Sequence, residues 1–459
     1  MTEETEIFEQ VQTALSRRNF QELKQMTAEM NPADIAAVMA DLRPEQLLLF
    51  FRLLPKDSAA DAFVEVDGDI QVELIKGFTD AELRSVMDDL FVDDAVDLIE
   101  EMPANVVRRI LKYTPADIRR TINELLAYPE DTAGSVMTVE YVDLKADMTV
   151  RQAFAHIRKT GVDKETIYTC YVVDKNRKLI GLVSVKDLLF ADYEDVVADI
   201  METNVISVDT LEDKEVVAQA FGKYNFIALP VVDKENRLVG IVTFDDAMDV
   251  IEEEATEDIE KMAAIVSTGD NVPYLRTAVF TFFKQRIIWL LLLMVSSTFT
   301  SLIINGFENS LSTCLVLTAF IPMLMGTGGN AGSQASVTVI RSLSLGDLDF
   351  RDVFRVIWKE VRVSVLCGLV LGIVNFGKML LVDRWLFQNP DVTWSVALVV
   401  SLSIVLTVLV AKFVGGLLPI LADRIGIDPA VMASPLITTT VDVLSLLIYL
   451  SFASAVLGL

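Results

Sequence analysis

One carboxylate, Asp442, lies inside the last long apolar stretch of this 459-residue chain, and no basic residue lies near it in the sequence. A charge at the centre of a membrane costs about 2.5–3.5 kcal/mol even on a lenient insertion scale, so such residues usually have a function. Thr438, Thr439 and Thr440 come just before it. Oxygen atoms gathered around a buried anion can hold a cation, so we expect Asp442, Thr438 and Thr439 to line a cation path.

Another apolar stretch, at 312–340, contains Asn330 and Gln334, which are four residues apart and would share one face of a helix. Amides and freed backbone carbonyls hold ions in membrane proteins, so we interpret both residues as pore-lining. The glycines of this stretch either let a neighbouring helix pack closely or mark a local break in the helix. They are Gly326, Gly328, Gly329 and Gly332.

Acidic residues recur at helical spacing in the first part of the chain. Asp93 and Asp97 are four apart, within a run of five aspartates at 88–97. A solvated acidic helix face is the alternative to a metal site there. His156 is the only histidine, and the three cysteines are isolated, so a metal site built on imidazole or thiolate is excluded. Any metal must be a hard cation held by oxygen.

The charge of −27 is unevenly distributed along the chain. Residues 1–272 hold 56 of the 66 acidic and 27 of the 39 basic residues, whereas the remainder is apolar and nearly neutral. The sequence therefore predicts an acidic soluble part followed by a membrane part. The acidic field repels nucleic acid and attracts cations, so we expect no nucleic-acid partner.

Residues 1–131 contain serial helices of about 10–15 residues, with Pro or Asp near their starts. The segment PADI opens two of them, at Pro32 and Pro115. This pattern predicts an all-α, superhelical N-terminal domain.

Residues 132–250 contain an internal repeat. The sixteen residues at 172–187 align without gaps to 231–246, a shift of 59, and half of the positions are identical. Each copy has the pattern of two strands joined by a turn, then a helix opened by Asp187 or Asp246. The repeat resembles a tandem pair of CBS domains, an α/β unit that commonly senses adenine nucleotides.

The acidic segment 251–272 has the composition of a connecting helix, and residues 273–459 form the membrane domain. Five stretches are long enough to span a bilayer: 285–306, 312–340, 360–382, 394–420 and 430–457. Basic residues concentrate before the first stretch and in the 341–362 loop, which places both on the cytoplasmic side of the plasma membrane and the C-terminus outside. We expect Lys378 and Lys412 to extend toward the membrane surface. Asp423 and Asp428 lie in the loop before the last stretch, where they could form a second ion contact at the pore mouth or cap helices, and Asp428, just before Pro429, has the position of a cap.

The segment PMLMGTGGNAGSQ, residues 322–334, closely matches the hallmark of the MgtE family of magnesium transporters. The order of parts matches as well: acidic helical domain, CBS pair, acidic connecting helix and five spans. The resemblance covers essentially the whole chain. It implies a homodimer in the membrane lipid with a central Mg²⁺ pore, an ion site at Asp442 and a connecting "plug" helix that closes the pore.

The resemblance also implies that Mg²⁺ bridges acidic residues of three parts. These are Asp93 and Asp97 in the N-terminal domain, Asp246 and Asp249 at the end of the CBS pair, and Glu254, Glu257 and Asp258 on the plug. Phe226 and Asp246 match a family nucleotide site, and the sequence leaves ATP binding there open.

Three functions remain in competition. The first is an Mg²⁺ transporter that cytosolic Mg²⁺ closes, and the second is a carrier for Mn²⁺ or Co²⁺ on the same scaffold. The third is a membrane-tethered nucleotide sensor, against which the buried polar residues Asp442, Asn330 and Gln334 speak. An enzyme is not expected, because no nucleophile with a neighbouring base and no phosphate-binding loop is present.

Overall fold

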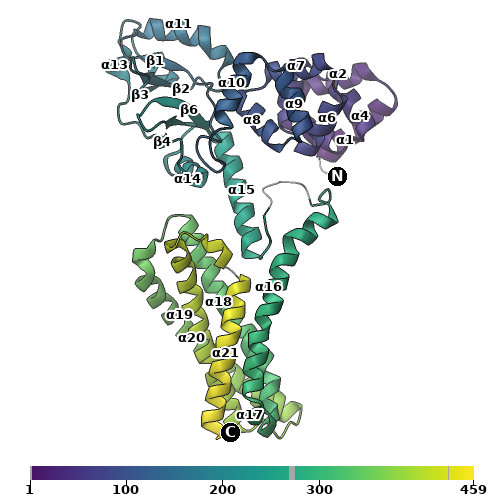
Figure 1. Ribbon diagram of the computed structural model, residues 1–459, viewed down its shortest axis with the longest axis vertical. Coiled ribbons are helices and arrows are strands. Elements are labelled where there is room, and N and C mark those ends of the chain that lie inside the picture. Colours follow the sequence, from purple (N-terminus) through teal and green to yellow (C-terminus); the bar gives the residue numbers. More distant parts are fainter. Residues whose placement is uncertain (1–2, 268–273, 433, 459) are drawn as a thin grey trace. The chain divides into compact units, whose positions relative to one another are not determined.

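The computed structural model describes residues 3–267, 274–432 and 434–458. The chain divides into two compact units, Met1–Glu252 and Glu253–Leu459 (Figure 1). The first unit contains the predicted helical domain and CBS pair, and the second contains the predicted membrane helices. The predicted fold class is confirmed.

Ten short helices form the first part of unit one. Asn31 caps the helix that opens at Pro32, and Thr79 and Glu82 form a reciprocal capping box, so the predicted Pro and polar starts are used. Phe51, Phe63 and Phe78 pack together in the core. The helices are α1 (Glu3–Ser16), α2 (Phe20–Glu29), α3 (Pro32–Ala40), α4 (Pro44–Phe51), α5 (Lys56–Val64), α6 (Gly68–Gly77), α7 (Asp80–Asp89), α8 (Val92–Glu101), α9 (Ala104–Tyr113) and α10 (Ala116–Leu125).

Two three-stranded sheets follow, in the orders β1-β2-β3 and β4-β5-β6. In each, the first pair of strands is parallel and the second antiparallel. Thr169 pairs with Ser184, and Ala228 pairs with Thr243, which is the same register displaced by the 59 residues of the sequence repeat. The strands are β1 (Asp143–Lys145), β2 (Thr169–Val173), β3 (Leu179–Ser184), β4 (Val208–Asp209), β5 (Ala228–Val232) and β6 (Leu238–Thr243).

Helices complete each half of this pair: α11 (Val150–Thr160), α12 (Val185–Phe190), α13 (Val197–Ile200) and α14 (Lys214–Tyr224). The first of these helices to follow a repeat copy, α12, opens three residues earlier than predicted, at Ser184, and Asp187 completes a capping box by accepting a hydrogen bond from Ser184 N–H. Asp246 does the same at the second copy, where its Oδ2 accepts hydrogen bonds from Thr243 N–H and Oγ1–H. That second helix, α15 (Phe244–Met262), runs without a break through residue 250. The predicted plug is therefore the continuation of the last CBS helix, and residues 268–272 of it lie outside the described residues.

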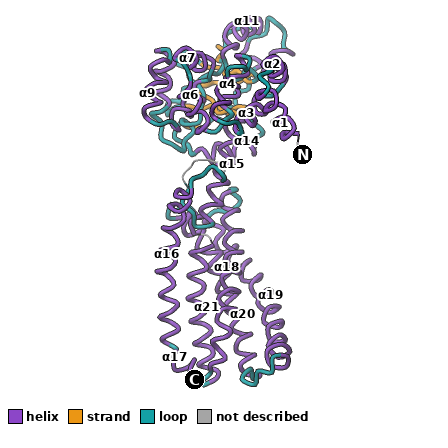
Figure 2. Tube along the Cα trace, turned by 90° about the vertical axis from the view of Figure 1, so that its right-hand side faces the viewer, coloured by secondary structure: helices purple, strands orange, loops and turns teal. Residues whose placement is uncertain are grey.

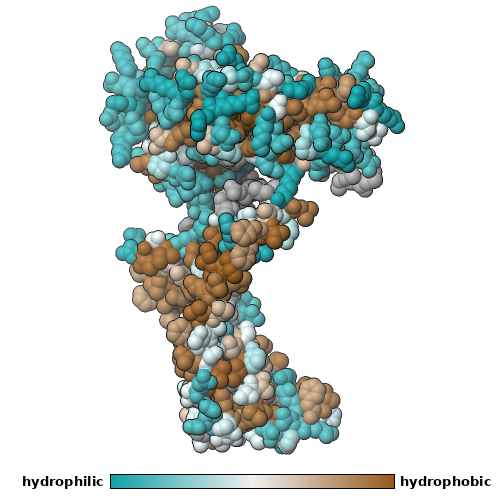
Figure 3. Space-filling view, turned by 45° about the vertical axis from the view of Figure 1, so that its right-hand side comes forward, coloured by the Kyte–Doolittle hydropathy of each residue, from teal (hydrophilic) through white to brown (hydrophobic). Residues whose placement is uncertain are grey.

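Within the described ranges of unit two, five helical segments are long and apolar enough to cross a membrane. They contain α16 (Val279–Gly306), α18 (Ile321–Ser344), α19 (Val353–Lys378), α20 (Trp394–Arg424) and α21 (Ser434–Leu457), and a short α17 (Glu308–Thr313) follows α16. The long helices run side by side in Figure 2. Hydrophobic residues cover much of the visible surface of this unit, whereas hydrophilic residues dominate that of unit one (Figure 3).

The glycines of α18 serve close packing, because the helix is continuous. A Cβ atom on Gly328 would lie 2.7 Å from both Ser445 Oγ and Thr407 Cγ2, and one on Gly329 would lie 2.8 Å from Thr438 Cγ2. On the neighbouring α20, a Cβ on Gly415 would collide with the Gly332 carbonyl oxygen. Of the two alternatives left open by the sequence, the broken helix is excluded, and α18 packs tightly against α20 and α21.

Candidate metal-binding and pore sites

An acidic cluster lies where the helical domain meets the CBS pair. Asp93 on α8 and two CBS-side residues, Glu140 and Glu165, bring carboxylate oxygens within 4.8 Å of one another. Backbone contacts set this geometry: Glu165 N–H donates to the Glu140 carbonyl at 2.9 Å, and Val92 N–H donates to Glu140 Oε2 at 3.1 Å. The residue that opens α8 is thus tied to a carboxylate of the CBS pair.

Three more acidic residues, Asp94, Asp97 and Asp246, interact electrostatically with this cluster and are counted with it below. Burial disfavours the charged forms of its carboxyls. It raises the pKa of Asp97 to about 8, with added repulsion from Asp246 and Asp93. Burial likewise raises the pKa of Glu165 to about 8, and repulsion from Asp93 and Asp245 adds to the shift. The pKa values of three further carboxyls are also raised, mainly by burial: Asp93, Asp94 and Asp246.

Two buried oxygens of the cluster, Asp93 Oδ1 and Glu165 Oε2, have no hydrogen-bond partner among the described residues. Buried acceptors normally have a donor or an ion, and an isolated buried charge is costly. An all-carboxylate donor set suits a hard divalent cation such as Mg²⁺. The arrangement can therefore bind such an ion and join α8 to the CBS pair through it.

Sequence reasoning found Asp93, Asp97 and Asp246 but missed Glu140 and Glu165. Both lie in irregular segments of the CBS pair, outside helices and strands, where no helical or strand periodicity in the sequence indicates which side chains share a face. Asp249 lies on the exposed side of α15. Among the described residues, it does not belong to the group of three carboxylates whose oxygens lie within 4.8 Å of one another.

The end of α15 packs within unit two against the end of α18 and the short helical turn that precedes α21. Met262 contacts Ile340 and Ala430, and Ser344 Oγ lies 3.3 Å from Asp258 Oδ2. Burial raises the pKa of Asp258, and the charge of Asp428 adds to this shift. The predicted plug residues Glu257 and Asp258 thus lie at this end of the bundle, and Glu254 lies one turn earlier on α15.

Asp442 lies eight residues after the start of α21, close to the middle of that helix. Its Oδ1 is buried and has no hydrogen-bond partner among the described residues. Thr438 and Ser445 lie one turn before and after it, and both contact the glycine face of α18. The hydroxyls of Thr439 and Thr440 donate to backbone carbonyls of their own helix at 2.9 Å each. A carboxylate with one unpartnered oxygen among the described residues therefore lies on α21 between two residues that pack closely against α18.

Asn330 and Gln334 lie on another side of α18. They line a cavity of about 620 Å³, and Lys412 of α20 is another of its lining residues. Among the described residues, the lining of this cavity includes neither Thr438, Thr439 nor Asp442.

The expectation that Lys412 extends toward the membrane surface is wrong. Its side chain is only 8% exposed, and its Nζ lies 3.8 Å from Glu360 Oε2 of α19. Glu360 also packs over Gly416, which leaves room for its side chain between the helices. Each of these two buried charges compensates the other, and burying either charge alone would be costly.

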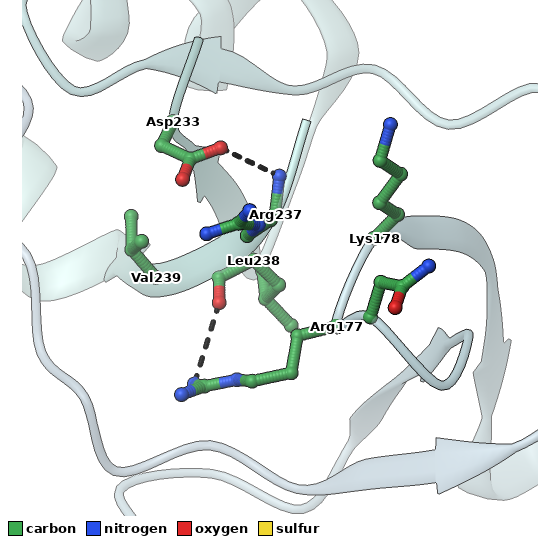
Figure 4. A pocket seen from close by; sticks show the side chains of 7 residues that line it. Arg177, Lys178, Asp233, Arg237, Leu238 and Val239 are labelled. Atoms are coloured by element: carbon green, nitrogen blue, oxygen red, sulfur yellow. Dashed lines mark hydrogen bonds between the residues drawn. The ribbon is translucent and has the colours of Figure 1, made fainter. Parts of the chain in front are cut away.

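Phe226 packs on Tyr224 at the end of α14, with ring centroids 5.3 Å apart, and Asp246 belongs to the acidic cluster. A separate cavity of about 480 Å³ lies at the tips of the two CBS hairpins (Figure 4). Arg177, Lys178 and Arg237 line it, and Arg177 donates to the Leu238 carbonyl at 3.4 Å. Its cationic lining is unsuited to Mg²⁺, and it includes neither Phe226 nor Asp246 among the described residues.

Comparison with known proteins decides the family. Family models match residues 30–131 (MgtE intracellular N domain), 133–194 and 197–253 (CBS domain) and 321–452 (MgtE, divalent cation transporter). The chain is 39% identical to the magnesium transporter MgtE of Thermus thermophilus, over 97% of this chain and 98% of the relative. This chain belongs to the MgtE family.

Other relatives agree with this assignment. The Bacillus subtilis magnesium transporter MgtE is 32% identical, over 93% of this chain and 92% of its own length. A crystal structure of the cytosolic domain of the Mg²⁺ channel MgtE in complex with ATP also matches. The match extends over 52% of this chain and 98% of the chain in that structure, with 37% identity and a TM-score of 0.50. The crystal structure of the soluble part of a magnesium transporter matches over 55% of this chain and over the whole of its own chain, with 30% identity and a TM-score of 0.51.

MgtE relatives are named as transporters, which confirms that the chain belongs to a transporter family and not to an enzyme family. The five apolar helices make it a multi-pass membrane protein. The predicted order of an N-terminal domain, a CBS pair and a membrane domain agrees with the three family models.

Proposed function

We propose that this protein carries Mg²⁺ across the plasma membrane, through a pore at the axis of a homodimer, and that cytosolic Mg²⁺ closes this pore. The observation that carries the proposal is Asp442, whose buried carboxylate lies near the middle of a membrane helix without a partner for its Oδ1 among the described residues. A cation passing along this helix would supply that partner. In a two-fold dimer, two copies of Asp442 would face one hydrated ion.

The acidic cluster supports closure by the transported ion. Without a divalent cation, carboxylates on α8 repel those of the CBS pair, and this repulsion adds to the effect of burial, which is the main cause of the raised pKa values of Asp97 and Glu165. Mg²⁺ binding would offset the repulsion and hold the parts of unit one together. A ligand shifts a conformational equilibrium only by its different affinity for the two states, and a cation bridging both sides of the cluster has that difference.

The role of the plug follows from the continuity of α15. Asp246 at its start belongs to the acidic cluster, and Asp258 near its end lies against α18. One helix therefore carries both a cation-sensing residue and a contact with the membrane bundle. We propose that Asp249, Glu254, Glu257 and Asp258 provide further Mg²⁺ contacts along it. The N-terminus and the loop between α18 and α19 lie in the cytoplasm, and the C-terminus lies outside.

ATP is proposed as a regulatory ligand of the CBS pair. A relative of 37% identity has been crystallised in complex with ATP, and the stacked pair of exposed Tyr224 and half-buried Phe226 offers an aromatic surface for a base. Titration of the purified protein with ATP, with a Phe226→Ala variant as the comparison, tests this point. Equal ATP affinity of both proteins would remove Phe226 from the proposed site.

Transport is tested with the protein in lipid vesicles that contain a fluorescent Mg²⁺ indicator. We expect Mg²⁺ entry that falls as Mg²⁺ on the cytoplasmic face rises from zero to tens of millimolar. Mn²⁺ and Co²⁺ in the outer solution distinguish the alternative cargo. Faster entry of either ion than of Mg²⁺, at equal concentrations, would favour a carrier for that ion, and no entry of any divalent ion would favour the tethered sensor.

A further inference from the structure

Lys261, in the last turn of α15, makes a direct charged contact between the plug and the membrane bundle. Its Nζ donates to Asp428 Oδ2 at 2.6 Å and lies 2.7 Å from Glu257 Oε1. The Lys261 side chain is 25% exposed and that of Asp428 is 36% exposed, so water screens the pair only in part. All of these residues belong to unit two.

Asp428 also binds the backbone of its own segment, just before the short helical turn that precedes α21. Its Oδ1 accepts a hydrogen bond from Ala430 N–H at 2.8 Å, which caps the turn Pro429–Met432, so the capping role expected from its position before Pro429 is present. One carboxylate therefore uses one oxygen to fix the backbone that leads into the Asp442 helix. It uses the other oxygen to bind the plug.

Three carboxylates, from Glu257, Asp258 and Asp428, surround the single ammonium of Lys261. Without a positive charge among them, the plug and the segment that precedes α21 would repel each other. A diffusible cation neutralises such a group only when its concentration is high enough. Lys261 is covalently attached to the plug, so its charge is present at every Mg²⁺ concentration.

We propose that Lys261 is a positioning residue that holds the end of α15 at the cytoplasmic end of the pore without Mg²⁺, and so lowers the Mg²⁺ concentration needed for closure. This inference rests on the proposed function, since it assigns the gate a fixed component and a Mg²⁺-dependent one. The fixed component comes from the lysine, and the variable component comes from the acidic cluster of unit one.

Two variants of Lys261 separate charge from size. Lys261→Met keeps a long side chain that can pack but removes the charge, and Lys261→Arg keeps the charge. Flux is measured in vesicles as a function of cytoplasmic-side Mg²⁺. For Lys261→Met we expect the Mg²⁺ concentration at half-closure to rise about two- to fivefold, as loss of a partly exposed ion pair would give. Lys261→Arg should stay within about twofold of the wild type.

Asp428→Asn provides a matched partner, because its amide oxygen can still cap Ala430 while the charge is lost. We expect the same upward shift, and the double variant Lys261→Met/Asp428→Asn should shift no further than either single variant. A midpoint that is unchanged in Lys261→Met, or that falls because Mg²⁺ replaces a competing lysine, would overturn the proposal.

Hydrogen exchange of residues 253–262 in the full-length protein gives a readout that does not depend on transport. At zero Mg²⁺, this segment should exchange faster in Lys261→Met than in the wild type and in Lys261→Arg. Equal exchange in all three would refute the fixed contact, even if the flux assay confirmed Mg²⁺-dependent closure. A wild type without Mg²⁺ flux, but with the expected exchange pattern, would refute the proposed function and leave the contact intact.

Discussion

Asp93 and Glu165 bring carboxylate oxygens within 4.8 Å of each other across the junction between α8 and the CBS pair, and each has one oxygen without a hydrogen-bond donor among the described residues. Two buried anions at this distance repel each other. The interaction between the two charged carboxylates is therefore unfavourable, and protonation of one of them or binding of a divalent cation relieves it. This relationship makes the assembly of unit one sensitive to the ion that the protein is proposed to carry.

Removing one negative charge from the cluster should stabilise unit one in the absence of a cation. In Mg²⁺-free buffer at pH 8, we expect Glu165→Gln to raise the free energy of unfolding of unit one by on the order of 1–3 kcal/mol, because the amide keeps the size and loses the repulsion. Chemical denaturation followed by circular dichroism measures this. Glu194→Gln, at an exposed ion pair with Arg151, is the control and should change stability little. A destabilised Glu165→Gln protein would contradict the account.

The pH dependence should be opposite to that of a protein held by salt bridges. The pKa values of Asp97 and Glu165 are raised to about 8, above those of the unfolded chain, so the folded form binds more protons between about pH 4 and pH 8. In Mg²⁺-free buffer, stability should therefore fall as the pH rises from 6 to 8.

Saturating Mg²⁺ should reduce that difference, because the bound cation takes the place of the protons. Thermal unfolding at pH 6 and pH 8, each with and without Mg²⁺, measures all four values. Equal melting temperatures at the two pH values without Mg²⁺ would show that the charged forms of these carboxyls do not destabilise the folded protein.

The glycine contact between α18 and α20 should tolerate no side chain. Gly415→Ala places a Cβ against the Gly332 carbonyl, so we expect a loss of about 1–3 kcal/mol through forced separation of the helices. Gly326→Ala is the matched control, since nothing lies within 4 Å of its Cβ position. Thermal stability in detergent, measured by loss of the folded peak in size-exclusion chromatography, compares the two. Similar behaviour of both variants would exclude close packing at Gly415.

Patterns that repeat along the chain could be predicted from the sequence. The shift of 59 residues between the CBS copies reappears as an identical strand register, because the same alternation of side chains sets the pairing in both. The five apolar stretches became five helical segments because length and hydropathy alone determine them.

Contacts between distant segments could not be predicted in this way. Glu140 and Glu165 join the acidic cluster from irregular segments, and the pairing of Lys412 with Glu360 depends on how α19 packs on α20. Lys261 is one basic residue in an acidic helix, and its sequence position alone gave no reason to assign it a role. Its partner Asp428 is 167 residues away.

The central claim is that Asp442 is the ion site of a Mg²⁺ pore, and Mg²⁺ flux through the Asp442→Asn protein in vesicles tests it most directly. The amide keeps the size of the side chain and removes the charge that holds the cation. We predict that flux falls at least about tenfold, the effect of roughly 1.4 kcal/mol in ion stabilisation. Asp391→Asn, an exposed aspartate in the loop between α19 and α20, should transport at the wild-type rate. Wild-type flux through a folded Asp442→Asn protein would contradict the account.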